Sequence, residues 1–259
     1  MLRISPLWLA LLAIAITPAR AEDTPPITTL LGAGLWSRPA YTGADSNRTA
    51  PIPVIRHYGQ PWFLRTTFGM LEGGLRTEVL SGLTLGGQLA YEDARDSSES
   101  EFLATHHLPT LNASISWGLH AELEKKLGRM PLIALLRYRQ DVDNNRGTQT
   151  DLRLTAGIFD SYGINAGIFY QATWANQKAA NYFYGITPQQ AASTGLSAFA
   201  AQEGEMFNAW GLLWSYDLNP RWILLGTFET RQLRGSVVNS PLVQQSSNLY
   251  TSLGLAYQF

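Results

Sequence analysis

Hydrophobic and polar residues alternate with a period of two along several segments of this chain, and the longest segment covers residues 111–124. Its two sets are Leu111, Ala113, Ile115, Trp117, Leu119, Ala121 and Leu123 against Asn112, Ser114, Ser116, Gly118, His120, Glu122 and Glu124. A helix would mix these sets around its circumference, whereas a strand sends successive side chains to opposite faces. The pattern therefore predicts an amphipathic strand.

Residues 132–141, 151–159, 207–217 and 248–259 repeat this alternation, and the first two of these segments carry charged side chains on the polar face. The charges expected on that face include Arg76, Glu78, Glu92, Glu122, Arg137, Arg139, Arg153, Glu229 and Arg231. Charges between apolar positions need water or partners of opposite sign. A membrane barrel would turn them into a polar lumen, whereas a soluble β-sandwich would turn them outwards.

Two features favour the barrel over the sandwich. The alternation persists over long strands, and aromatic residues tend to end the apolar faces, as at Tyr91, Tyr138, Tyr170 and Tyr216. Aromatic residues at strand ends are typical of the two membrane interfaces. No stretch after the N-terminus reaches the length of apolar residues that a transmembrane helix needs.

Connections of two kinds also alternate. Short turns are expected at residues 58–61, 81–82, 125–131, 160–163 and 217–220, and longer polar loops at 37–50, 93–109, 142–148, 174–203 and 235–247. Short turns on one rim and long loops on the other are typical of outer-membrane barrels. The sequence therefore predicts an all-β fold, a closed antiparallel transmembrane β-barrel.

Strand centres are expected near residues 32, 54, 64, 76, 87, 117, 136, 154, 167, 210, 226 and 254. Residues 61–80 would form one long strand, or two strands joined near Gly69 and Met70. Both termini of such barrels normally lie in the periplasm, which requires an even number of strands. We therefore expect about twelve strands, with ten as the fallback.

The two ends of the chain carry export signals. Arg3, an apolar run over residues 7–17 and the small-residue pair Ala19 and Ala21 predict a signal peptide, residues 1–21, cleaved after Ala21. The barrel domain would then cover residues 22–259. The last segment places Leu255, Tyr257 and Phe259 on one apolar face, which resembles the terminal strand that the barrel-assembly machinery reads.

Composition narrows the classes further. The formal net charge of −1 and the 15% of charged residues do not indicate nucleic-acid binding, and the absence of cysteine excludes disulfides. His120 shares the polar face with Ser116, but a lumen histidine is the simpler interpretation. His106 and His107 point to opposite sides if extended, which disfavours a metal site. We predict no catalytic residues, no metal and no cofactor.

Three segments resemble the MipA/OmpV family of MltA-interacting proteins, and the likeness spans essentially the whole mature chain. Residues 34–45 resemble the family's opening motif, residues 182–196 its long loop, and residues 240–243 a motif before its last strand. The matching positions are Pro39, Tyr41, Gly43, Asp45, Tyr182, Phe183, Gly185, Thr187, Ser193, Gly195, Ser240 and Pro241. Residues 94–96 and 106–109 depart from the family's pattern, which puts any function of that loop in doubt.

The resemblance implies a scaffolding protein of the Gram-negative outer membrane, which would hold a murein lytic transglycosylase and a murein synthase together. Lipid, lipopolysaccharide and the barrel-assembly machinery would be further partners. The alternative is a narrow channel for small solutes, with mixed lumen charges restricting its bore. An outer-membrane enzyme is the third and least favoured hypothesis.

Overall fold

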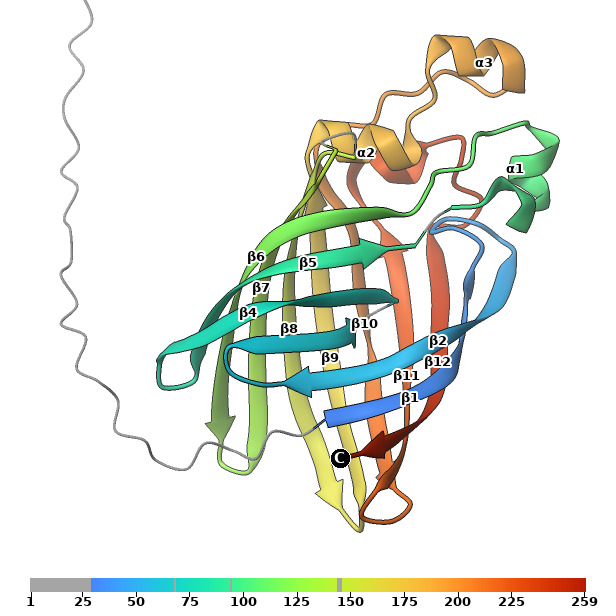
Figure 1. Cartoon of the computed structure of the whole chain (residues 1–259). Coiled ribbons are helices and arrows are strands. Elements are labelled where there is room, and N and C mark those ends of the chain that lie inside the picture. Colours follow the sequence, from blue (N-terminus) through green and yellow to red (C-terminus); the bar gives the residue numbers. More distant parts are fainter. Residues whose placement is uncertain (1–28, 68, 94, 144–145) are drawn as a thin grey trace, which may run out of the picture.

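Twelve strands follow one another around a closed antiparallel barrel, with β1 paired to β12, in a computed structural model that describes residues 29–259 except 68, 94, 144 and 145 (Figure 1). The expected signal peptide and its cleavage site lie outside the described residues. The strands are β1 (Thr29–Pro39), β2 (Asn47–Tyr58), β3 (Trp62–Thr67), β4 (Met70–Leu80), β5 (Leu83–Glu92), β6 (Ser114–Leu127), β7 (Met130–Asp141), β8 (Thr148–Ser161), β9 (Ile164–Ala175), β10 (Gly204–Asp217), β11 (Trp222–Leu233) and β12 (Ser247–Gln258). The prediction of twelve strands is confirmed, and residues 61–80 form two of them.

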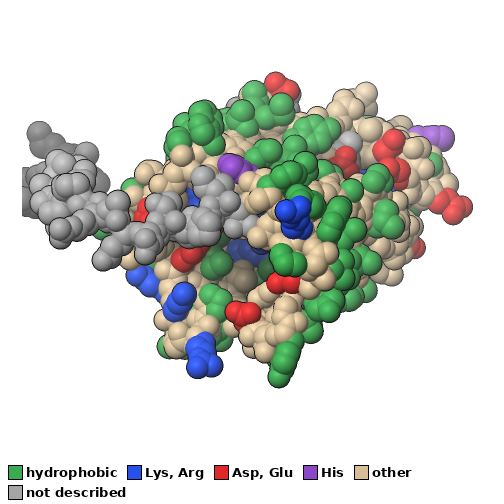
Figure 2. Space-filling view, turned by 60° about the horizontal axis from the view of Figure 1, so that its bottom comes forward, with side chains coloured by type: hydrophobic (Ala, Val, Ile, Leu, Met, Phe, Trp, Pro, Cys, Tyr) green, Lys and Arg blue, Asp and Glu red, His purple; other side chains and the backbone are tan. Residues whose placement is uncertain are grey.

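The apolar side chains of the alternating pattern face outwards and the charged ones face the lumen, as in a membrane barrel. Leu35, Leu119 and Trp210 are 59%, 59% and 60% exposed on the outer wall, whereas Glu72 and Arg137 are 0% and 2% exposed inside. Large apolar side chains left facing outwards are stabilised by hydrocarbon, at about 1.5–3 kcal/mol each relative to water. Figure 2 shows hydrophobic side chains along the outer wall and a hollow at the rim facing the viewer. The sandwich alternative is therefore wrong.

Short turns join the strands at one rim, here called the inner rim, through residues 59–61, 81–82, 128–129, 162–163 and 218–221. Most connections at the outer rim are longer: residues 40–46, 93–113, 142–147, 176–203 and 234–246. The connection between β3 and β4 is the exception, because only residues 68–69 separate these strands at the outer rim. Short turns on one rim and longer loops on the other are the usual asymmetry of outer-membrane barrels, whose short turns lie on the periplasmic side.

Two boundaries differ from the expected ones. β6 begins at Ser114 rather than at Leu111, because Leu111 forms an isolated bridge with Arg95 inside the long loop. The turn expected over residues 125–131 is shorter, since Gly128 takes a φ of 63° and lets Leu127 pair with Met130. A glycine with positive φ at the first central position closes a two-residue hairpin.

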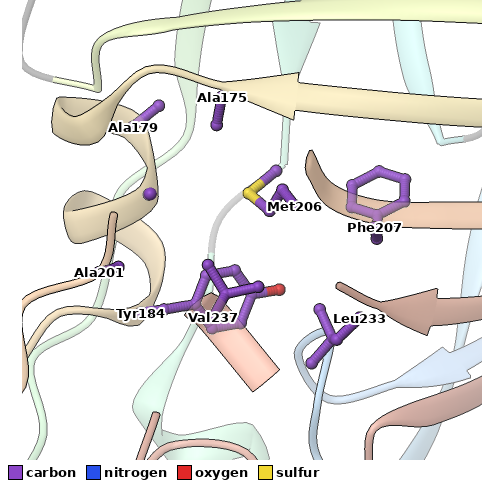
Figure 3. Packing of buried hydrophobic residues seen from close by; sticks show 9 residues of the cluster. Ala175, Ala179, Tyr184, Ala201, Met206, Phe207, Leu233 and Val237 are labelled. Carbon is purple, nitrogen blue, oxygen red and sulfur yellow. The ribbon is translucent and has the colours of Figure 1, made fainter. Parts of the chain in front are cut away.

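The outer loops carry the short helices η1 (Ser97–Glu99), α1 (Glu101–Thr105), α2 (Gln177–Tyr184), α3 (Pro188–Thr194) and η2 (Gly235–Asn239). Helix α2 lies across the mouth of the barrel, with Ala179, Ala180 and Tyr184 buried against Met206 and Phe207 (Figure 3). Helix α3 buries no residue and projects away from the barrel (Figure 1). Among the described residues, no helix is long and apolar enough to cross a membrane.

Candidate functional site

A network of buried ion pairs lies inside the lumen. Glu72 of β4 accepts hydrogen bonds from Arg65 of β3 and from Arg137 of β7, the latter at 2.8 Å. Arg137 also contacts Asp151 of β8 at 2.9 Å, and the amide of Gln88 donates to Glu72 at 3.0 Å. The members come from the consecutive strands β3 to β8, and the pair of Glu72 with Arg137 joins two of these strands that are not neighbours in the sheet.

Arg139 extends the network towards the outer rim, where it pairs with Glu92 and, at 3.2 Å, with Asp151. Thr173 donates to the other oxygen of Asp151 at 2.8 Å. Moving a charge out of water costs several kcal/mol, so removing one member of such a set typically costs about 3–5 kcal/mol. The charge network, as we call Arg65, Glu72, Gln88, Glu92, Glu122, Arg137, Arg139 and Asp151, therefore resists opening.

Eight of the nine charges expected in the lumen lie on the inner face of the wall, including Glu92 as the partner of Arg139. Arg137, Arg139 and Glu122 belong to the charge network, and Arg76 approaches Glu122 at 3.9 Å. The other three lie outside the charge network: Arg153 of β8 stacks on Phe169, and Arg231 pairs with Glu229 of the same strand, β11, at 2.8 Å. Sequence reasoning missed Glu72 and Arg65, although Glu72 shares the alternate positions of Arg76, which would have indicated its direction.

The expectation that Glu78 faces the lumen is wrong. The Glu78 side chain is exposed and accepts a hydrogen bond from the backbone of Gly82 at 2.7 Å. It lies next to the β4–β5 turn, where the strand pair reaches beyond the lumen. Position along the strand, and not only its parity, decides whether a side chain is enclosed.

The family-like loops meet above the charge network and form a loop cap, residues 40–46, 93–113, 176–203 and 234–246. The Tyr41 hydroxyl donates to the carbonyl of Leu242 at 2.9 Å, and the Gly43 backbone N–H donates to Asn248 at 2.7 Å. Burial raises the pKa of Tyr41, so this phenol remains a neutral donor. Gly43 has a φ of 103°, a conformation that favours glycine.

The other two family-like segments join the same cap. The Ser240 hydroxyl donates to the carbonyl of Tyr184 at 2.6 Å, and Thr187 closes a capping box with Gln190 at the start of α3. The remaining matching positions divide by exposure: Pro39 is buried, Tyr182, Phe183, Gly185 and Pro241 are half-buried, and Asp45, Thr187, Ser193 and Gly195 are exposed. The cap thus gathers motifs that are far apart in the sequence.

The segment that departs from the family's pattern is also part of the cap. Arg95 donates to the carbonyl of Phe183 at 3.0 Å and lies over the ring of Tyr41. Burial lowers the pKa of Arg95. Asp96 accepts from Ser98, and these hydrogen bonds hold the pKa of the Asp96 carboxyl below its usual range.

In the part of the chain that the structure describes, the histidines and serine considered for catalysis or metal binding are not arranged as such a site requires. His120 bonds to Gln88 at 2.8 Å and packs edge-on against Phe63, while the Ser116 hydroxyl has no hydrogen-bond partner. A nucleophilic serine needs a base within hydrogen-bond reach. No group of three or more metal-ligating side chains occurs among the described residues.

Cavities lie on both sides of the charge network. A space of ≈ 190 Å³ separates the network from the cap and is lined by Trp36, Arg139 and Tyr184, among others. A larger one of ≈ 600 Å³, here called the lumen cavity, lies on the inner side and includes Val54, Arg76 and Leu225 in its wall. The expected assembly-signal residues lie elsewhere, on the outer wall: Leu255 and Phe259 are exposed, and Tyr257 packs between Trp222 and Phe259.

Comparison with known proteins agrees with this architecture. MltA-interacting proteins of Escherichia coli (strain K12) and Shigella flexneri are each 25% identical to the chain over 237 residues, which is 88% of either partner. An outer-membrane channel from Pseudomonas putida F1 has a TM-score of 0.55 at 13% identity, over 94% of this chain and 100% of that one, a likeness that shows the fold alone. The model of the family described as MltA-interacting protein MipA matches residues 31–259, and the chain therefore belongs to this family of outer-membrane barrels.

Proposed function

We propose that the protein is a non-enzymatic scaffold of the outer membrane that holds a murein lytic transglycosylase and a murein synthase at the periplasmic face. Family membership supports this proposal, since the relatives are named for interacting with MltA. The observation that carries it is the cap over the outer mouth, with the buried ion pairs beneath it. A barrel that is covered by a packed cap and narrowed by buried ion pairs is better suited to presenting a surface than to passing solutes.

The β6–β7 hairpin is the best candidate for the docking surface at the inner rim. Leu127 at its tip is 65% exposed, and Lys125, Lys126 and Arg129 beside it are also exposed. Figure 2 shows Lys and Arg side chains projecting from one side of this rim. An apolar anchor surrounded by charges matches the arrangement of an interface core and its rim.

The test is co-purification from a detergent extract of the cell envelope, with the full-length tagged barrel as bait. We expect the transglycosylase and the synthase to be enriched at least fivefold over an unrelated barrel of similar size. Reversal of the three hairpin charges, Lys125→Glu, Lys126→Glu and Arg129→Glu, should remove most of that enrichment. Reversal of Lys178 and Glu203 at the outer rim is the matched control and should leave it unchanged.

Recovery equal to that of the unrelated barrel would contradict the scaffold. Loss of recovery with both sets of reversals would contradict only the assignment of the hairpin. Heat-modifiable mobility on gels confirms that each variant is folded before its recovery is compared.

A further inference from the structure

The wall of the barrel is incomplete between β2 and β3. β2 pairs with β1 along its length from Asn47 to His57, but it pairs with β3 only at Arg56, His57 and Tyr58. Among the residues that the structure describes, residues 47–55 have no strand partner on the β3 side, and β3 ends at Thr67 after six residues. Figure 1 shows β2 running on towards the outer rim past the end of that short strand.

Gly69, just before β4, lies against the β1 side of the wall. It has a φ of 78° and lies so close to Trp36 that a Cβ atom would be 2.2 Å from the indole ring. Trp36 lies on β1 beside Ala50 of β2 and lines the cavities on both sides of the charge network. Gly69 therefore lies on the lumen side of the wall.

Two prolines on β2 fit an open edge. The backbone N–H of Gly59 donates to Trp62 at 2.8 Å, so odd-numbered residues of β2 direct their backbone groups towards β3. Pro51 and Pro53 fall in this set and have no N–H to direct. Each unsatisfied donor in hydrocarbon costs several kcal/mol. The sequence therefore removes two donors at the place where no strand would accept them.

The opening is bounded above and below, and we call it the slit. Arg48 of β2 forms ion pairs with Asp93, at 2.9 Å, and with Glu99, which link β2 to the β5–β6 loop above the slit. The short β2–β3 pairing closes it below. About nine to eleven strand residues span the hydrocarbon core, so most of residues 47–55 lie at membrane depth.

The lumen cavity reaches the slit. Pro53, whose position belongs to the lipid-facing set, lines it together with the inward-facing Ile52 and Val54. At ≈ 600 Å³ the cavity falls within the range of small-molecule sites, about 300–1,000 Å³. An apolar molecule in the membrane would therefore find a continuous path from lipid into the barrel.

One wall of the lumen cavity is apolar, with contributions from Ile52, Val54, Leu213, Leu225 and Leu253. The other carries arginines with spare donors. Nη2 of Arg65 and Oγ1 of Thr66 are buried and have no hydrogen-bond partner among the described residues. Arg76 is 3.9 Å from Glu122, and no ion pair of Arg56 occurs in the described part of the chain.

We propose that the slit and the lumen cavity bind a single-chain amphiphile with a carboxylate headgroup, which enters sideways from the membrane. The apolar chain lies against Val54 and Leu225, and the carboxylate accepts hydrogen bonds from Arg56 and Arg65. This site is independent of the proposed scaffold, which uses the inner rim.

The test is calorimetric titration of dodecanoate into the full-length barrel in maltoside micelles. We expect saturable binding at one site. Val54→Trp fills the cavity and should weaken binding at least tenfold, whereas Leu89→Trp, at a lipid-facing position that is 58% exposed, should not. Arg56→Gln should weaken dodecanoate several-fold and leave the weaker binding of dodecanol unchanged.

Absence of saturable binding would overturn the proposal, and so would equal binding by Val54→Trp and Leu89→Trp. Equal affinity of the wild type for dodecanoate and dodecanol would overturn the assignment of a carboxylate ligand. Leu225→Phe serves as a second cavity-filling variant if Val54→Trp does not fold, as judged from heat-modifiable mobility.

Discussion

Replacing both Pro51 and Pro53 by valine tests whether the edge of β2 is open. Each valine adds a backbone donor at an edge that has no protein acceptor, and an unsatisfied buried donor costs about 1–3 kcal/mol. Loss of the proline ring adds about 0.4–1 kcal/mol per site through the unfolded chain. We therefore expect the double variant to lose about 3–8 kcal/mol of unfolding free energy.

The assay is urea unfolding in micelles or liposomes, followed by heat-modifiable mobility and intrinsic fluorescence. Ala50→Val is the matched control, because the backbone of Ala50 is directed towards β1. If β2 were fully paired, each valine would instead gain a hydrogen bond of about 0.5–1.5 kcal/mol, which offsets the lost proline stiffness. An unfolding free energy within about 1 kcal/mol of the wild type would refute the open edge.

Three further outcomes follow from the lumen and the β3–β4 turn. Glu72→Gln leaves Arg65 and Arg137 without their shared carboxylate and should cost about 3–5 kcal/mol, measured by the same unfolding assay, and a loss below about 1 kcal/mol would contradict a buried network. The wild type should show no resolved conductance steps in planar bilayers, and Arg139→Ala combined with deletion of residues 177–194 should produce them; steps in the wild type would support the channel instead. Gly69→Ala should displace the turn from its indole contact at a cost of about 1–3 kcal/mol, seen as changed tryptophan fluorescence, and an unchanged spectrum would contradict that contact.

The sequence alone predicted the barrel, its twelve strands and the side of the wall on which most charges lie. These properties follow from local rules. Each strand meets lipid on one face and the lumen on the other. In a segment such as 114–127, odd-numbered and even-numbered side chains therefore face different environments, and the residue types show which is which. Turns such as Gly128 and Gly163 also act locally, through positive φ angles of 63° and 73°.

Contacts between residues that are distant in the sequence could not be predicted from the alternation. The pairing of Glu72 with Arg137 joins β4 to β7, and the hydrogen bond of Tyr41 to Leu242 joins the first outer loop to the last. Alternation shows which face a side chain occupies, but not which inward side chain it meets. The sequence therefore predicted which charges face the lumen, but not that they form one network. It likewise identified the family-like loops, but not that they pack together in one cap.

The slit illustrates the difference between what the sequence predicts and what only the tertiary structure shows. Pro51 and Pro53 have no backbone N–H to donate, but only the register of the barrel showed that they face the side of β2 without a strand partner. Near that edge Gly69 packs on Trp36, a contact between distant segments that the local sequence pattern cannot predict. The alternation of apolar and polar residues determines that a segment is a strand and which of its faces meets lipid. The closure of the wall depends instead on where each strand ends relative to its neighbours.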